Sequence, residues 1–468
     1  MDTYSESTFN DISLHAEQNP LKHLFEEKDL KQGFWFNTIS KTIIIISLIL
    51  VIFLSYFYSQ QLFELKDILQ QNKYSIYYLY SIRIFFLINV LVLLWRIILM
   101  FKYRPAPDCD NDSLPSCTVI VPAFNEGKQV FATLKSIASS DYPRDKLRII
   151  AVDDGSIDDT FFWINKAAKK LSHNITTIKL QYNQGKRRAL YHGINKSNSE
   201  VIVTVDSDSV LEPITIRSLV SPFVHNKRLG AVAGNVRVLN LHEGMIPRML
   251  DVVFLYSFDF IRAGQSVVNT VICTPGALSA YRSDILLKVL PEWLDQKFFG
   301  QEAKIGEDRA MTNLILREGF LVHFQRNAYV YTNVPTQYRN LCKMLLRWAR
   351  SNIRETYVMS KFAFRKFRKE PALGARINLI LQLMTLSKGQ LLLLTSVIFL
   401  LICPSQFSLN ILFGVMVTSS IPAILYVWHQ KTTDCLWAYA YGLFWLISLS
   451  WITPYALITP YKSDWLTR

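Results

Sequence analysis

Apolar residues are concentrated near the two ends of this 468-residue chain, and this distribution constrains its fold more than any other feature. Residues 42–58 form an uncharged apolar run, and residues 76–101 form a second one. Three more follow the middle of the chain, at residues 390–403, 409–428 and 436–457. Apolar runs of roughly 17–25 residues can cross the hydrocarbon core of a bilayer as helices. We therefore expect a globular domain inserted between two groups of transmembrane helices.

Some details of these segments stay open. Residues 377–387 are apolar but short, so they form either a re-entrant piece or the first half of a span broken near Lys388 and Gly389. Arg83, near one end of the second run, either extends to the headgroups or lines a path for a polar product. The segments could also be buried core helices, but their length and lack of charge argue against this.

The basic residues predict the orientation in the membrane. A dense basic stretch precedes the C-terminal spans: Lys343, Arg347, Arg350, Arg354, Lys361, Arg365, Lys366, Arg368, Lys369 and Arg376. The positive-inside rule places this stretch in the cytoplasm. Two N-terminal spans put the N-terminus on the same side, and the polar first 40 residues do not resemble a signal peptide. We expect a multi-pass protein of the cell (inner or plasma) membrane with a cytosolic central domain.

The net charge of +14 calls for an anionic partner. A lipid surface and an anionic substrate fit this charge. Nucleic acid is not expected as a partner, because the chain has neither zinc-ligand spacing nor a basic helix-turn-helix pattern. The six cysteines form no CxxC pair, which favours a reducing compartment over a disulfide framework.

The middle of the chain alternates between short β-type runs and helical ones. The expected buried strands are residues 117–121, 147–152, 176–181 and 201–205, and the expected helices include residues 131–140 and 160–171. This alternation is typical of an α/β sheet of Rossmann-like character. The chain has no GxGxxG turn, which argues against a dinucleotide oxidoreductase.

Acidic residues follow two of these strands. Asp153 and Asp154 follow one strand, and Asp206 and Asp208 follow another. Ligands of open α/β sheets bind beyond the carboxyl ends of the strands. Carboxylates there can hydrogen-bond a nucleotide, or hold a hard cation that neutralises a diphosphate. Aspartates at such positions are also common in turns and helix caps, so either pair alone leaves both interpretations open.

The motifs occur in a specific order along residues 117–356. They are VPAFNE at 121–126, VDDGS at 152–156, NQGKRR at 183–188, DSD at 206–208, TPGA at 274–277, GEDR at 306–309 and RW at 347–348. This series resembles the family-2 glycosyltransferases with a GT-A fold, and within them the processive hyaluronan, chitin-oligosaccharide and cellulose synthases. The GEDR and RWARS segments look closest to the hyaluronan and chitin-oligosaccharide branch. Residues 465–468 (WLTR) also resemble a WGTR-type segment of that branch.

The resemblance implies a UDP-sugar donor and assigns residues to it. Asp153 and Asp154 would hold the uracil and the ribose. Asp206 and Asp208 would form the DxD pair, with Asp208 as the ligand of Mg²⁺ or Mn²⁺. Lys186 would contact the nucleotide or its phosphates, although its chemistry also fits a solvated basic turn.

The resemblance also implies catalytic and acceptor-binding residues. Asp308 would be the general base. Glu307 beside it, also at the acceptor site, would help to raise the pKa of Asp308 by charge repulsion. Arg347 would neutralise the departing diphosphate. Trp348 would stack on a sugar of the growing glycan acceptor. Attack from the face opposite UDP would invert the anomeric carbon and give a β-linked product.

The helix that carries RW departs from the family pattern. Leu341, Met344, Leu345 and Trp348 share the spacing of an amphipathic helix face. The family pattern is usually QxxRW, and Met344 occupies the Gln position. Met344 either alters an otherwise ordinary acceptor site or packs into an apolar helix face.

The sequence therefore predicts a polymerase of UDP-sugars. UDP-GlcNAc is the first expected donor, then UDP-GlcNAc alternating with UDP-GlcA, then UDP-Glc. The spans would enclose an export channel that begins next to Trp348. Two alternatives remain: a transferase that adds one sugar to a lipid carrier, and a non-catalytic receptor for nucleotide sugars or polysaccharide. The expected layout is a polar tail (1–40), two spans (41–102), a GT-A domain (115–335), interface helices (336–375), three or four spans (376–460) and a tail (461–468).

Overall fold

The computed structural model describes residues 27–57, 73–171, 174–402 and 404–462. The first 26 residues of the expected tail and the WLTR segment at 465–468 lie outside the described residues.

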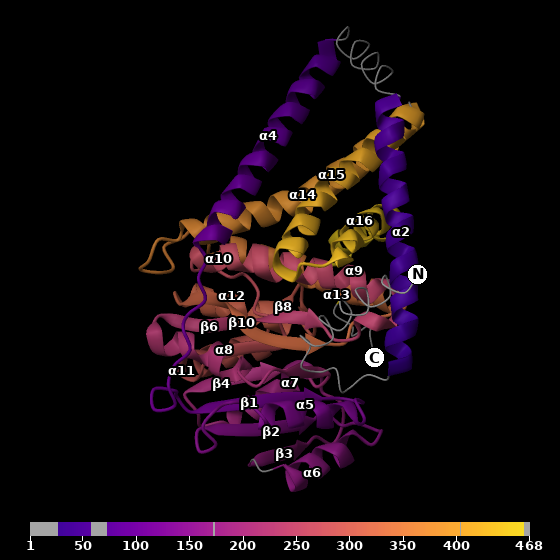
Figure 1. The fold of residues 1–468 in the computed structure, drawn as a ribbon. Coiled ribbons are helices and arrows are strands. Elements are labelled where there is room, and N and C mark those ends of the chain that lie inside the picture. The colour runs from indigo at the N-terminus through magenta and orange to yellow at the C-terminus, as the bar shows by residue number, and fades with distance from the viewer. Residues whose placement is uncertain (1–26, 58–72, 172–173, 403, 463–468) are drawn as a thin grey trace.

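An eight-stranded mixed sheet forms the centre of the molecule, with its layers of helices shown in Figure 1. Its order is β3-β2-β1-β4-β7-β6-β10-β5. The strands are β1 (Cys117–Ala123), β2 (Leu147–Asp153), β3 (Ile175–Lys179), β4 (Val201–Val205), β5 (Ser209–Leu211), β6 (Leu229–Val238), β7 (Leu278–Arg282) and β10 (Leu321–Thr332). A separate hairpin pairs β8 (Lys297–Phe298) with β9 (Gln301–Glu302).

The four strands expected from the sequence form one half of this sheet, β3-β2-β1-β4, with parallel pairing. Every residue of β1 and β4 is buried, as expected for apolar β-branched runs covered on both faces. The other half differs, because β7 runs antiparallel to both β4 and β6. The sheet is therefore mixed rather than all-parallel.

Helices cover both faces of the sheet and connect its strands. They are α5 (Gln129–Ala138), α6 (Thr160–Lys170), α7 (Lys186–Asn195), α8 (Thr215–His225), α9 (Met245–Leu255), the π-helix η3 (Tyr256–Arg262), α10 (Ala263–Val267), α11 (Ser283–Leu294), α12 (Glu307–Arg317) and α13 (Tyr338–Ser360). The 3₁₀ turn η2 (Leu241–Glu243) precedes α9.

The apolar ends of the chain form helices on one side of the domain, at the top of Figure 1. They are α2 (Glu27–Phe57), α4 (Lys73–Lys102), α14 (Leu373–Ile402), α15 (Pro404–Gln430), η4 (Thr433–Leu436), α16 (Trp437–Phe444), η5 (Trp445–Leu449) and α17 (Ile452–Ile458). In the described part of the chain, three stretches are long and apolar enough to cross a membrane: Trp35–Phe57, Arg83–Lys102 and Ile411–Gln430.

Three features of these helices bear on the expected spans. The N-terminal helix begins at Glu27 and so includes polar residues before the apolar run at 42–58. α14 continues through Lys388 and Gly389, where a break was one of the two expectations. The last expected span, residues 436–457, is bent by 46° between Thr433–Leu449 and Ile452–Ile458, which together are long and apolar enough to form one span.

Polar contacts connect the apolar helices to one another and to the central domain. Lys41 on α2 forms an ion pair of 2.8 Å with Asp434 of η4, and Asn37 donates to the same carboxylate. On α15, the Tyr426 hydroxyl donates to Asp251 of α9 at 2.8 Å, and this contact joins the apolar helices to the central domain.

Candidate active site

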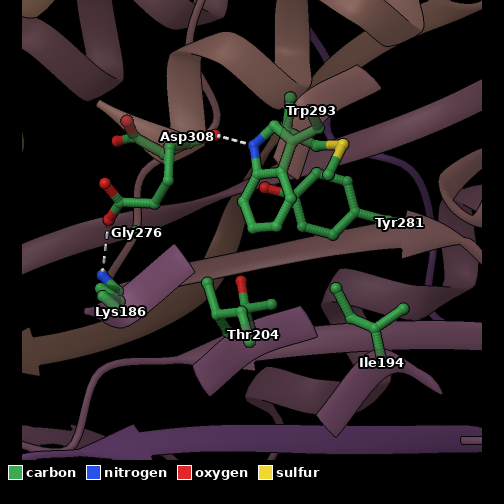
Figure 2. A pocket seen from close by; sticks show the side chains of 10 residues that line it. Lys186, Ile194, Thr204, Gly276, Tyr281, Trp293 and Asp308 are labelled. Atoms are coloured by element: carbon green, nitrogen blue, oxygen red, sulfur yellow. Dashed lines mark hydrogen bonds and ion pairs between the residues drawn. The ribbon is translucent and has the colours of Figure 1, made fainter. Parts of the chain in front are cut away.

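The carboxyl edge of the sheet brings the predicted motifs together. β2 ends at Asp153, β4 ends just before Asp206, and α7 begins at Lys186. α12 begins at Glu307 and reaches the same edge from the other half of the sheet. Figure 2 shows Lys186, Gly276 and Asp308 around one pocket, although they are up to 122 positions apart in sequence (308 minus 186).

Lys186 connects the DSD and GEDR motifs. Its ammonium lies 2.5 Å from Asp206 Oδ1 and 3.2 Å from Glu307 Oε1. Gly276 makes room for this bridge, since a Cβ at this position would lie 2.8 Å from Lys186 Nζ. Lys186 therefore does not lie in a solvated basic turn, which was the other possibility for it.

Glu307 and Asp308 are neighbours with opposite pKa shifts. Burial opposes ionisation of Glu307, but the positive charges of Lys186 and Arg347 outweigh burial and lower its pKa. Burial raises the pKa of Asp308, and the negative charge of Glu307 raises it further. The lowered pKa keeps Glu307 anionic at neutral pH, and the raised pKa gives the Asp308 carboxylate a higher affinity for a proton than an ordinary aspartate has.

Asp308 is held in a defined position at the start of α12. Its Oδ1 accepts from the Arg309 amide at 2.7 Å, and the Cys273 thiol lies 3.7 Å from its Oδ2. Gly306, just before it, has φ +71°, and a Cβ there would lie 1.8 Å from Ser351 Oγ. Only glycine fits this turn, which directs both acidic side chains toward the pocket.

Asp153 and Asp154 differ in their environment. Asp153 is fully buried, and its Oδ1 accepts from the Ser156 amide at 3.1 Å. Its Oδ2 is buried without a hydrogen-bond partner among the described residues, as expected where a ligand supplies the missing donor. Asp154 accepts from the amides of Gln184 and Gly185, each at 2.8 Å, and so holds the turn that leads to Lys186.

The DSD carboxylates supply oxygen ligands of the type that Mg²⁺ and Mn²⁺ prefer. Burial and the charge of Asp206 raise the pKa of Asp208 to about 6. Thr332 donates to Asp208 Oδ1 at 3.3 Å. The described residues contain no group of three His, Cys, Asp or Glu side chains that could hold a metal unaided. The pair therefore fits a cation whose other ligands come from a bound diphosphate and water.

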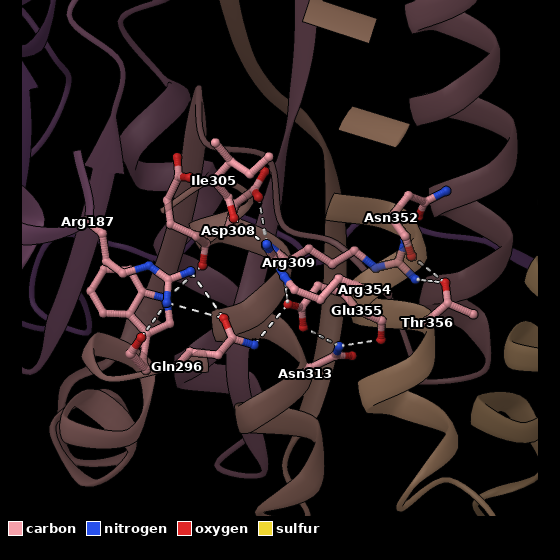
Figure 3. A network of polar contacts seen from close by, with 12 residues as sticks. Arg187, Gln296, Ile305, Asp308, Arg309, Asn313, Asn352, Arg354, Glu355 and Thr356 are labelled. Carbon is pink, nitrogen blue, oxygen red and sulfur yellow. Dashed lines mark hydrogen bonds and ion pairs between the residues drawn. The ribbon is translucent and has the colours of Figure 1, made fainter. Parts of the chain in front are cut away.

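A buried polar network connects the three helices of the site (Figure 3). Glu355 of α13 is fully buried and accepts from Arg354 (3.0 Å), Gln296 (2.9 Å) and Asn313 of α12 (2.9 Å). Gln296 in turn accepts from Arg187 of α7 at 3.2 Å. The helices that carry Lys186, Glu307, Asp308 and RW are thus fixed to one another through Glu355.

The RW residues lie on α13, whose apolar face is buried. Leu341, Met344 and Leu345 belong to the main hydrophobic core, which confirms the amphipathic spacing. Met344 packs in that core, so the second of the two expectations for it is confirmed. Arg347 is partly buried, and its charge acts on Glu307 and Asp308. Trp348 remains 43% exposed, with its ring 6.2 Å from that of Phe254.

A cavity extends from these charged groups into the domain (Figure 2). Lys186, Gly276, Glu307 and Asp308 lie at its polar end. Its remaining walls are largely apolar and come from Leu190, Ile194, Thr204, Tyr281, Trp293 and Met311. The site therefore joins an ionic region to a mostly apolar recess.

Residues 115–351, half of the chain, match the family model described as glycosyltransferase like family 2. The chain belongs to glycosyltransferase family 2. It is therefore a sugar-transferring enzyme, and the expectation of a non-catalytic receptor is wrong.

Curated relatives support the branch expected from GEDR and RWARS. The chain is 31% identical to an N-acetylglucosaminyltransferase of Rhizobium meliloti over 78% of this chain and 84% of the relative. It is 26% identical to a hyaluronan synthase of Streptococcus pyogenes over 92% of this chain and 97% of the relative. The transferase thus resembles the chitin-oligosaccharide and hyaluronan group.

A solved structure supports the fold. A mannosyltransferase from Pyrobaculum calidifontis, solved with GDP-Man and Mn²⁺, superposes with a TM-score of 0.54 at 20% identity. The match covers 76% of this chain and 94% of the mannosyltransferase. This similarity confirms the GT-A fold.

Sequence reasoning missed the residues that hold the site together. Glu355, Asn313 and Gln296 carry no recognisable motif, and Cys273 is next to TPGA without being part of it. One feature of the sequence could have indicated this network. Arg354 and Glu355 are adjacent charged residues on the amphipathic helix α13, so at least one of them must face the interior. Their partners lie 42 or more residues away and could not be identified from spacing.

Proposed function

We propose that this transferase polymerises UDP-GlcNAc, alone or with UDP-GlcA, into a β-linked glycan by an inverting, divalent-metal-dependent reaction. The observation that carries the proposal is Asp308. It is a partly buried carboxylate with a raised pKa, placed beside the Lys186–Asp206 ion pair and on the same edge of the sheet as Asp153.

Asp153 is the proposed contact for the uracil. Its buried, unpartnered Oδ2 would accept from the N3–H of the base, and this would satisfy an acceptor that is otherwise costly to bury. Asp154 is better described as a positioning residue, because both of its oxygens hold the Gln184–Gly185 turn. Each Asp154 oxygen keeps a second acceptor position, which could accept from a ribose hydroxyl while the two amides stay bound.

Asp206 and Asp208 would hold Mg²⁺ or Mn²⁺, with Asp208 as the principal ligand. When bound, the cation would neutralise charge on the diphosphate leaving group. The Lys186 ammonium forms an ion pair with Asp206. We propose that the Lys186 ammonium leaves Asp206 and contacts a phosphate oxygen when the donor binds. The same ammonium would then pair with the DSD motif before binding and with the nucleotide after it.

Asp308 would remove the proton from the acceptor hydroxyl. A carboxylate with a raised pKa suits this role, since proton transfer is most efficient when the base has a pKa close to the working pH. Glu307 contributes the negative charge that raises the pKa of Asp308. Arg347 would stabilise the negative charge that develops on UDP, and exposed Trp348 would stack on the acceptor sugar.

Named relatives that are N-acetylglucosaminyltransferases support an N-acetylated donor sugar.

Polymer synthesis on this scaffold would be coupled to export. The apolar helices lie directly against the domain that holds the site, and α13 leads from Trp348 toward α14. A hydroxyl-rich chain cannot cross hydrocarbon unaided at acceptable cost. The spans would therefore enclose a channel that begins near Trp348, with the catalytic domain in the cytosol.

The test uses the full chain, purified and reconstituted into sealed vesicles with the catalytic domain outward. Each radiolabelled UDP-sugar is supplied outside, alone and in pairs, with Mg²⁺ or Mn²⁺. The proposal predicts a product of many GlcNAc-containing units, trapped inside and protected from added glycosidase. A single sugar on lipid as the only product would favour the single-addition transferase and contradict polymerisation.

A further inference from the structure

The segment that joins α13 to α14 presents an exposed basic and apolar surface. In residues 361–373, four exposed basic side chains surround two exposed apolar ones: Lys361, Arg365, Lys366 and Lys369, with Phe364 (57% exposed) and Leu373 (62% exposed). None of the four basic residues pairs with a carboxylate among the described residues. Two basic residues that precede this segment, Arg350 and Arg354 of α13, are buried inside the protein instead.

This segment is held in a fixed shape. Arg368 is buried and donates to the Asn269 carbonyl and to Thr270 Oγ1, each at 3.1 Å. Glu370, the only acidic residue between 356 and 402, is paired with Arg228 of the catalytic domain at 2.7 and 3.1 Å. The segment therefore keeps its positive charge, because its single carboxylate is already neutralised.

Its position relates it to the ends of the apolar helices. At the start of α14, Gly374 packs so closely on Val268 that a Cβ would lie 2.5 Å from the Val268 side chain. Gly264 of α10, the helix that ends just before Val268, faces Leu99 near the end of α4. Figure 1 shows the loop projecting sideways at the level where α4 ends. The loop thus lies where membrane-crossing helices would leave the hydrocarbon.

We propose that residues 361–373 form a docking site for anionic phospholipid headgroups, with Phe364 and Leu373 inserted at the acyl boundary. Basic residues near an anionic leaflet gain about 1 kcal/mol each, and apolar side chains between them add burial. The site would hold α13, and with it Arg347 and Trp348, at a set depth below the bilayer. This inference needs only membrane insertion and does not rest on the proposed reaction.

The experiment measures hydrogen–deuterium exchange of residues 361–373 in the full chain. Short-chain phosphatidylglycerol or phosphatidylcholine is titrated into protein held in a neutral detergent. The test variant combines Arg365→Glu, Lys366→Glu and Lys369→Glu. The matched control combines three exposed lysines at the far end of the domain, Lys135→Glu, Lys169→Glu and Lys170→Glu.

Phosphatidylglycerol should slow exchange of the segment in the wild type and in the control, and phosphatidylcholine should not. The test variant should need on the order of 100-fold more lipid for the same protection. This factor counts about fivefold for the loss of each of three positive charges, and the added negative charges should increase it further. Phe364→Ser should keep the charge-dependent binding and weaken the protection. Equal protection by both lipids, or equal loss in the control variant, would overturn the proposal. Protection by an added acidic polypeptide but not by phosphatidylglycerol would assign the surface to a protein partner and overturn it too.

Discussion

Removal of the charge of Glu355 tests whether the buried network positions the active site. Glu355→Gln keeps the size of the side chain but leaves Arg354, which is only 1% exposed, without its carboxylate partner. Loss of one partner of a buried ion pair costs about 3–5 kcal/mol. For a domain of this size the midpoint of thermal unfolding shifts by about 2–4 °C per kcal/mol, so we expect a decrease of roughly 6–20 °C.

The same substitution should slow catalysis without removing any group that contacts substrate. Glu355 connects α13 to Asn313 on α12 and, through Gln296, to α7. A displacement of about 1 Å between these helices would lower the transfer rate on the order of 100-fold, while UDP still binds at the Asp153 end. The measurements are thermal unfolding in detergent, transfer rate and UDP affinity.

Glu292→Gln is the matched control for Glu355→Gln. Glu292 pairs with Arg317 at 2.5 Å, but its side chain is 56% exposed. Exposed pairs contribute about 0–1 kcal/mol, so the midpoint should change by about 4 °C or less and the rate should stay normal. Equal effects of the two substitutions, or a Glu355→Gln protein with wild-type midpoint and rate, would refute the positioning role.

Three further predictions concern the site itself. Chelation with EDTA should abolish transfer, and Asp208→Ala should remove the metal dependence of UDP binding; undiminished activity in excess EDTA would contradict a metal site. Met344→Gln should mainly lower the unfolding midpoint, because it places an amide in the hydrophobic core; unchanged stability with altered product length would instead assign Met344 to the acceptor site. Transfer should fall as pH falls through the raised pKa of Asp308, since only the ionised carboxylate accepts a proton, and a pH-rate profile that stays flat down to the ordinary pKa of an aspartate would exclude this base.

Two strands in the parallel half of the sheet, β1 and β4, were predictable because they are mostly apolar runs. All residues of β1 and β4 are buried, so they need no polar face and stand out from their surroundings. β10 was harder to recognise, because buried and half-buried residues alternate irregularly along its 12 residues and its register to β6 shifts. β7 was missed since its five residues include Ser279 and Arg282, which are polar.

The site was predictable where a motif records a chemical requirement. Gly306 must be glycine because a Cβ would collide with Ser351, and the two acids after it share one helical turn. The Lys186 bridge was not predictable, since its length depends on how closely α7 approaches α12 across the sheet. The amide contacts of Asp154 were also not predictable, because their donors, Gln184 and Gly185, lie 30 and 31 residues later in the sequence.

The most direct test of the proposed mechanism is transfer from UDP-GlcNAc by purified Asp308→Asn, measured beside its affinity for UDP. Asparagine keeps the size of the side chain but cannot accept the proton. We expect transfer to fall by about two or more orders of magnitude, the usual scale for loss of a positioned base, while UDP affinity stays within about twofold of the wild type. A variant that transfers GlcNAc within a few-fold of the wild-type rate would show that Asp308 is not the base.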